Sequence, residues 1–299
     1  MTTFIDRLTA GYFSMVGARS RWVDASAGRI HVLDLDGTGD LPTLVLVHGM
    51  SARSTHFAGV AHRLRAHYRR ILIPDLLGHG RSFVPDEPIS GPTMQQAFNE
   101  TLDALLDGVE PVVLYGNSLG GYGAIRYAHR SPERVAALIV NSPGGGALRS
   151  LSMQDYLRRF DVSTHQQAVD FARDYLGGPL RRMPLRHLVA RGVLAQLQDP
   201  TVRGFINSLD DSDFLEQRHL QELSMPTLML WGQKDDIMHE EQRRFFVDNL
   251  PEDALFEQPE SYGHAPYIEY PVHLADRILA FCDRQLKARG IDLNASETR

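Results

Sequence analysis

The sequence predicts an α/β protein with a mostly parallel central sheet that is flanked by helices. Strand-like apolar segments alternate with segments of helical spacing, and several of the strand-like segments are apolar throughout. A parallel strand that helices cover on both faces has this unbroken apolar character, whereas a half-exposed strand alternates. The alternation stops after residue 142 and resumes near residue 223, which indicates a helical insertion within the sheet-forming part of the chain.

The strand-like segments follow one another with helical segments between them. Residues 29–35 alternate as a half-exposed strand, and residues 43–47 form an unbroken apolar run. After this run, apolar residues recur at helical spacing: Phe57, Val60 and Leu64. The further strand-like segments are residues 71–73, 111–115, 135–140, 227–230 and 255–257. Right-handed crossovers between such strands place the active groups outside their carboxyl ends.

The interruption defines the expected domain organisation. Residues 147–222 are helical in pattern, with Arg-rich and acidic patches and no long strand-like run. We expect an α/β core made of residues 1–142 and 223–299, and a helical cap made of residues 143–222 that covers the site. Residues 1–20 have apolar side chains at helical spacing, so we expect an amphipathic helix that docks on the protein's own body, with contact to a membrane surface or a partner as the alternative.

Composition excludes some classes of function. The 299 residues carry a formal net charge of -6 with a pI of about 6.1, which argues against nucleic acid as a partner. The single cysteine, Cys282, excludes an intrachain disulfide, and its helical pattern places it in the core. Neither a targeting signal nor a run of roughly 20 apolar residues occurs, so we expect a cytoplasmic protein without an integral membrane span. The oligomeric state is open.

The most informative motif is Gly116–Gly120, which places one serine between an apolar segment and a helical one. A serine on such a sharp turn takes strained backbone angles, and side chains two positions away on either side would collide. Gly116 and Gly120 remove that collision. We expect the hydroxyl of Ser118 to project above the sheet as a nucleophile, with the N–H of Leu119 facing the same space.

A base and an acid follow Ser118, each after a strand-like segment. His264 would take the Ser118 proton as general base, and Asp235 would hold the imidazole in the correct tautomer. Asp236 is a rival to Asp235. The preceding core strand ends at Asn141, which offers no carboxylate.

An oxyanion loop is expected after an earlier strand, where His48-Gly49-Met50 follows Val47. Gly49 permits a close backbone turn. The N–H of Met50 can then pair with that of Leu119 to hold a developing alkoxide. The side chain of Met50 is expected to be a wall of the acyl pocket.

Together these motifs resemble the α/β-hydrolase fold superfamily, in its capped, esterase- and lipase-like branch of serine hydrolases. The resemblance covers nearly the whole chain and is carried by His48-Gly49, Asp75–Ser82, Gly116–Gly121, Gly232–Asp235 and Gly263-His264. It implies Ser118 as nucleophile, Asp235 as acid, His264 as base, and the N–H groups of Met50 and Leu119 as the oxyanion hole. The Asp75–Ser82 segment resembles a structural turn of the family, so we assign no chemistry to His79.

We therefore expect hydrolysis of a small-molecule carboxylic ester through an acyl-Ser118 intermediate, without a cofactor or a metal. Clustered metal-ligand spacing is missing from the sequence despite its thirteen histidines. Several apolar side chains of the cap, together with Met50, would favour an apolar acyl or alcohol group: Leu151, Met153, Tyr156 and Phe160.

Two alternatives stay open. The Gly116–Ser118 segment resembles the elbow of meta-cleavage hydrolases, which hydrolyse a carbon–carbon bond and usually carry a tryptophan after the catalytic histidine. This chain has Ala265-Pro266-Tyr267 instead. Such enzymes bind a substrate carboxylate with arginine, and the cap offers candidates at Arg181, Arg182, Arg186 and Arg191, which we interpret as a solvated face. The non-enzymatic alternative is a ligand receptor on the same fold, although it would not need an intact set of catalytic residues.

Overall fold

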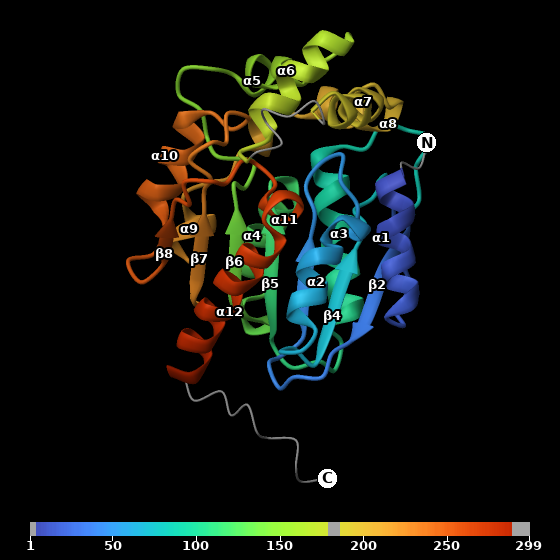
Figure 1. Ribbon diagram of the computed structural model, residues 1–299. Helices are drawn as coiled ribbons and strands as arrows, with labels where there is room; N and C mark the ends of the chain where they lie inside the picture. The colour runs from blue at the N-terminus through green and yellow to red at the C-terminus, as the bar shows by residue number, and fades with distance from the viewer. Residues whose placement is uncertain (1–3, 179–185, 289–299) are drawn as a thin grey trace.

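The computed structural model describes residues 4–178 and 186–288, which form one eight-stranded sheet with helices on both faces (Figure 1). The strands are β1 (Arg19–Ala25), β2 (Gly28–Asp36), β3 (Leu44–Val47), β4 (Arg70–Pro74), β5 (Val112–Asn117), β6 (Val135–Asn141), β7 (Thr227–Leu230) and β8 (Leu255–Glu257). Their order in the sheet is β1-β2-β4-β3-β5-β6-β7-β8. Only the β1–β2 and β2–β4 pairs of this sheet are antiparallel, so the predicted mostly parallel sheet is confirmed.

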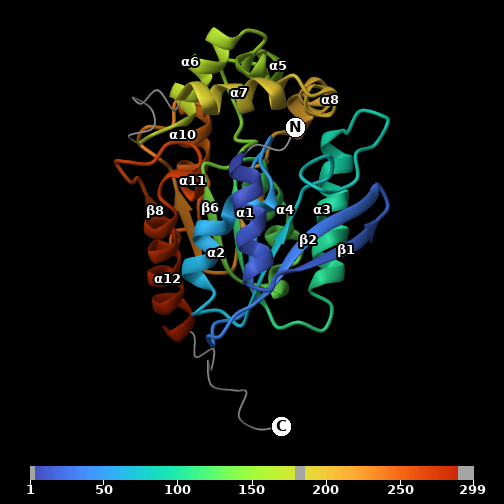
Figure 2. The same cartoon turned by 45° about the vertical axis from the view of Figure 1, so that its right-hand side comes forward.

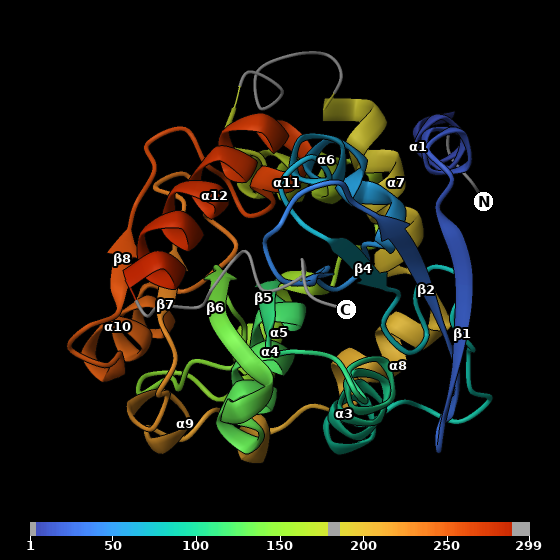
Figure 3. The same ribbon diagram turned by 90° about the horizontal axis from the view of Figure 1, so that it is seen from below.

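Helices cover the sheet in two groups (Figure 3). One face carries α1 (Phe4–Met15), α2 (Ala58–Leu64), α11 (Pro266–Glu269) and α12 (Pro271–Ala288). The other face carries α3 (Gly91–Leu105), α4 (Leu119–Arg130), α9 (Arg218–Gln221) and α10 (Glu240–Asn249). Short 3-10 helices occur at Ser54–Phe57, Pro132–Arg134, Arg158–Phe160 and Asp211–Asp213.

The unbroken apolar run of β3 follows from burial on both faces. Leu44 and Leu46 pack in the apolar cluster on the α1, α2 and α12 side, whereas Val45 and Val47 pack in the cluster on the α3 and α4 side. Because successive side chains of a strand point to opposite faces, each core needs its own set of apolar residues. All four side chains are fully buried.

Two smaller expectations are borne out on the α12 side of the sheet. Cys282 is buried, and burial raises the pKa of its thiol to about 12. Phe13 of α1 is buried in the same cluster, and its neighbour Tyr12 packs against that cluster, so this helix docks on the body of the protein. None of the helices in the described residues has both the length and the apolar character that crossing a membrane requires.

Between β6 and β7 the chain forms a separate group of helices above one end of the sheet (Figures 1 and 2). We use the term helical layer for α5 (Met153–Leu157), α6 (His165–Tyr175), α7 (Arg186–Leu197), α8 (Pro200–Ser208) and the 3-10 helix Arg158–Phe160. The layer has an apolar cluster of its own, which includes Met153, Leu157, Ala172 and Ile206. The cap boundaries at residues 143 and 222 stay a prediction.

Candidate active site

Ser118 lies on a strained turn between β5 and α4. Its φ of 54° and ψ of -118° lie outside the regions that a serine ordinarily adopts. The turn is close-packed, because a Cβ on Gly116 would lie 2.4 Å from the carbonyl oxygen of Gly120. A Cβ on Gly120 would lie 2.5 Å from the carbonyl oxygen of His48. The two glycines are therefore required where the sequence pattern has them.

His264 and Asp235 are in direct contact. The Nδ1 atom of His264 lies 2.8 Å from Oδ2 of Asp235, and both side chains are buried. The other carboxylate oxygen accepts the N–H groups of Ile237 at 3.0 Å and Met238 at 3.3 Å. Burial alone would raise the pKa of Asp235, but the charge and hydrogen bond of His264 and the N–H of Met238 hold it below its ordinary value. Asp236 is exposed, so Asp235 is the carboxylate on the imidazole.

Two asparagines hold the backbone of His264 beside the serine turn. The carbonyl oxygen of His264 accepts the side-chain amides of Asn117 at 2.8 Å and Asn141 at 3.1 Å. The Ser118 N–H donates to the carbonyl of Asn141 at 3.0 Å, which ties the turn to the same point. Asn117 and Asn141 are register partners at the ends of β5 and β6. Neither asparagine carried a predicted role, although each lies at the end of a strand of the sheet.

The His48-Gly49-Met50 loop lies against the serine turn, since a Cβ on Gly49 would be 3.0 Å from Cβ of Ser118. The N–H of Leu76 donates to Nε2 of His48 at 3.1 Å, which leaves the proton on Nδ1, 2.8 Å from the Gly49 carbonyl oxygen. Burial lowers the pKa of His48 to about 3, so this neutral tautomer persists across the working pH range. The bond fixes the direction of the Gly49 carbonyl and so orients the peptide that carries the Met50 N–H.

The Asp75–Ser82 segment forms a buried polar turn behind this loop. Asp75 accepts the N–H of Ser54 at 2.6 Å and that of Arg81 at 3.1 Å, and its Oδ2 lies 2.8 Å from Nδ1 of His31. His79 is buried with Nδ1 at 2.9 Å from the Leu77 carbonyl oxygen. These contacts serve the backbone of the turn, in agreement with the structural interpretation of this segment.

The comparison with protein families decides the identity of the fold. Residues 42–271 match the family described as the alpha/beta hydrolase fold. The chain belongs to this family. The resemblance predicted from the motifs is therefore confirmed.

Relatives of this alpha/beta hydrolase include proteins named for ester hydrolysis. It is 30% identical over 261 residues to a pimeloyl-[acyl-carrier protein] methyl ester esterase of Xanthomonas campestris pv. campestris, covering 83% of this chain and 98% of that one. It is 26% identical over 261 residues to Lipase 1 of Psychrobacter immobilis, covering 80% and 76%. Its fold is similar to that of a 2-hydroxy-6-oxo-6-phenylhexa-2,4-dienoate hydrolase from a Rhodococcus species, with a TM-score of 0.75, 18% identity and coverage of 90% and 99%. The named relatives support a hydrolase that acts on esters in general.

The helical layer of the alpha/beta hydrolase contacts both the loop that carries Asp235 and the loop that carries His264. The His264 N–H donates to the carbonyl of Tyr175 at 2.9 Å, and the two rings lie 5.5 Å apart. The Asp236 N–H donates to the carbonyl of Asp174 at 3.2 Å. The carboxyl end of α6 therefore binds the loop that carries Asp235 and the loop that carries His264 at the same time. The sequence offers no signal for this contact, because it joins segments far apart in the chain.

Glu269 of α11 anchors the chain just after α6. Its two carboxylate oxygens accept the N–H groups of Gly177 at 2.8 Å and Gly178 at 2.9 Å. Burial raises the pKa of Glu269, although both N–H groups and the charge of Lys234 favour its ionised form. One acidic side chain thus connects α11, which begins two residues after His264, to the helical layer.

Glu269→Gln is expected to lower the melting temperature by a few degrees. A glutamine offers one oxygen to two N–H groups, and a half-buried N–H without its acceptor costs about 1–3 kcal/mol. Thermal unfolding followed by circular dichroism measures the effect. Glu252→Gln, at an exposed position in the loop before β8, is the matched control. An equal melting temperature for the two variants would contradict the anchoring role.

Two further expectations concern metal and arginine ligands. Within residues 4–178 and 186–288, groups of three or more His, Cys, Asp or Glu that could hold a metal ion do not occur. Arg181 and Arg182 lie outside the described residues, and the side chain of Arg186 is also outside them. Arg191 is exposed on α7.

Proposed function

We propose that this alpha/beta hydrolase is a serine hydrolase of carboxylic esters, with Ser118 as nucleophile, His264 as general base and Asp235 as the acid of the triad. The observation that supports this most is the 2.8 Å contact between His264 and Asp235, because the same histidine is bonded through its backbone to Asn117, next to Ser118. The strained turn at Ser118 and the relatives named as an esterase and a lipase point the same way.

In the proposed mechanism the Ser118 oxygen attacks the ester carbonyl carbon while its proton passes to Nε2 of His264. The N–H groups of Met50 and Leu119 hold the resulting oxyanion, since Leu119 opens α4 and its N–H has no partner within the helix. The intermediate collapses to acyl-Ser118, and the alcohol leaves with the proton from His264. Water then attacks the acyl group with His264 again as base, which releases the acid and restores the serine.

We also propose that residues 143–222 act as a cap over a core made of residues 1–142 and 223–299. Tyr175 places its carbonyl on the His264 N–H and its ring beside the imidazole, so the layer shields the base from water. A small-molecule ester would bind beneath or within this layer. A dry site strengthens the interaction between oxyanion and N–H donors.

A fluorophosphonate probe tests the serine assignment directly. The folded protein is incubated with the probe, digested and analysed by mass spectrometry. We expect a single adduct on Ser118 that is missing in Ser118→Ala and in heat-denatured protein. No adduct on Ser118 in folded protein would overturn the serine-hydrolase proposal and would favour a ligand receptor.

A substrate panel then separates ester from carbon–carbon hydrolysis. We expect turnover of 4-nitrophenyl esters and none of a dienoic diketone acid. Turnover of the diketone acid at a higher kcat/KM than any ester would replace the ester proposal by the carbon–carbon one.

A further inference from the structure

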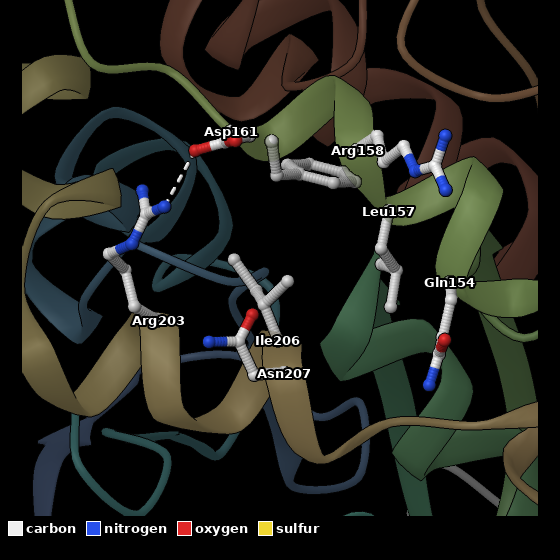
Figure 4. Close-up of a pocket in the computed structure, with 8 residues that line it drawn as sticks. Gln154, Leu157, Arg158, Asp161, Arg203, Ile206 and Asn207 are labelled. Carbon is white, nitrogen blue, oxygen red and sulfur yellow. Dashed lines mark hydrogen bonds and ion pairs between the residues drawn. The ribbon is translucent and has the colours of Figure 1, made fainter.

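A cavity of about 360 Å³ lies within the helical layer, between the α5 side and α8 (Figure 4). Sites for small molecules begin at about this volume. Leu157, Phe160 and Ile206 form its apolar part, and Leu157 and Ile206 are buried. Figure 4 shows Gln154 and Leu157 on one side and Asn207, Ile206 and Arg203 on the other, with open space between them. The cavity therefore separates two walls, each built on a different helix of the layer.

The apolar lining of the cavity belongs to a cluster of side chains against which Met50 of the proposed oxyanion loop packs. Leu157 and Ile206 belong to the apolar cluster against which Met50 packs. Met50 follows Gly49, where an added Cβ would lie 3.0 Å from Cβ of Ser118. Phe160 packs against this cluster and also against the sheet core on the α4 side. Contacts between packed apolar side chains thus connect the lining of the cavity with the proposed oxyanion loop.

The wall that α5 forms is bonded to the loop that carries Asp235. The Tyr156 hydroxyl donates to the sulfur of Met238 at 3.3 Å, and Arg159 donates to the carbonyl of Ile237. Ile237 and Met238 are the residues whose N–H groups bind Asp235. A chain bound against this wall is therefore held at a constant place relative to the triad.

The charges at the rim of the cavity are already paired. Arg203 donates to Asp161 at 2.6 Å across the gap between the two walls, and Arg158 lies 3.1 Å from Asp155. An arginine that binds a substrate carboxylate must first break its ion pair with the aspartate beside it, so these pairs disfavour an acidic ligand. The side chains of Gln154 and Asn207, which complete the polar rim, are uncharged.

We propose that this cavity binds the acyl chain of the ester, and that the chain is an uncharged aliphatic one of medium length. The proposal rests on the serine esterase function proposed above. Ile206 and Leu157 are then specificity-determining residues, and the Arg203–Asp161 pair closes over the chain at the protein surface.

Kinetics with matched esters test the proposal. From 4-nitrophenyl acetate to hexanoate, kcat/KM is expected to rise by about fourfold per methylene group that enters the cavity. The mono-4-nitrophenyl ester of adipic acid, which has six carbons and a terminal carboxylate, is expected to be poorer than the hexanoate by at least about tenfold. An adipate ester that equals or exceeds the hexanoate would overturn the uncharged-chain proposal.

Ile206→Trp tests the location by filling the cavity. The ratio of kcat/KM for hexanoate to that for acetate is expected to fall at least about tenfold. The control is Val272→Trp at an exposed position of α12, where the ratio should stay as in the wild type. Asn207→Trp, at an exposed lining position, repeats the test if Ile206→Trp does not fold. An unchanged ratio in a folded variant of either lining residue would show that the chain binds elsewhere.

A binding measurement separates this proposal from the proposed function. Calorimetric titration with 1-octanol is expected to show binding to Ser118→Ala and the loss of that binding when Ile206→Trp is added. Binding without any ester turnover by the wild type would leave the cavity assignment standing and overturn the esterase proposal. Ester turnover without octanol binding would leave the esterase proposal standing and overturn the cavity assignment.

Discussion

Ser118→Ala is expected to lower kcat for a 4-nitrophenyl ester by roughly 10⁴- to 10⁶-fold, while the substrate still binds. Alanine keeps the Cβ, so the turn at a φ of 54° loses its hydroxyl without gaining a steric conflict. The remaining rate over water would come from the N–H groups of Met50 and Leu119 and from binding alone.

Single-turnover and steady-state assays on purified protein measure this loss. Ser14→Ala, at an exposed position of α1, is the matched control and should retain the wild-type kcat. Equal kcat values for Ser118→Ala and the wild type would remove Ser118 from the mechanism. Equal melting temperatures of the two variants would confirm that the loss is chemical.

Asp235→Asn is expected to lower kcat by roughly 10²- to 10⁴-fold, because an amide can donate to Nδ1 of His264 and so favour the wrong tautomer. Asp236→Asn is the matched control, since Asp236 is the exposed neighbour, and its kcat should stay within about tenfold of the wild type. A larger loss in Asp236→Asn than in Asp235→Asn would reverse the assignment of the acid.

The pH dependence of the rate separates the base from the acid. The pKa of Asp235 lies below its ordinary value, so this carboxylate is ionised at neutral and mildly acidic pH. A general base must be unprotonated to accept the Ser118 proton, so kcat/KM is expected to fall on acidification while Asp235 is still ionised. A flat profile down to about pH 4 would count against His264 as base.

The depressed pKa of Asp235 also makes the stability of the folded protein depend on pH. Because the folded-state pKa of Asp235 is depressed, its contribution to stability is present above the pKa of the unfolded chain. That contribution is lost as the pH falls through the lower pKa of the folded state. The difference in melting temperature between the wild type and Asp235→Asn should therefore shrink below about pH 4.

The parts of this molecule that the sequence predicted are those encoded in contiguous residues. The serine turn needs glycine at positions 116 and 120 for local steric reasons, and the buried strand β3 needs apolar residues on both of its faces. Strand β1 escaped prediction because it is an edge strand with one buried residue, Val23, and its other side chains carry no period-two pattern.

The contacts that support the candidate site could not be predicted from the sequence, for a different reason. Asn117 and Asn141 meet at His264 only because β5 and β6 are adjacent and in register, and Glu269 meets Gly177 only because α11 lies against the end of α6. Asparagine at a strand end and glutamate on a short helix are common in sequences. Their role depends on which distant segment the fold brings to them.

The bond from the His264 N–H to the carbonyl of Tyr175 limits how such an enzyme can diversify. In a chimera that exchanges the whole stretch between β6 and β7 with a relative, the incoming chain must supply a carbonyl at the same point. Otherwise the loop that carries His264, the proposed base, loses a backbone hydrogen-bond partner. The transferable unit is therefore the insertion without residues 174–178, which are better kept with the α/β core. New substrate preferences can be grafted on α5, α7 and α8 while the carboxyl end of α6 stays native.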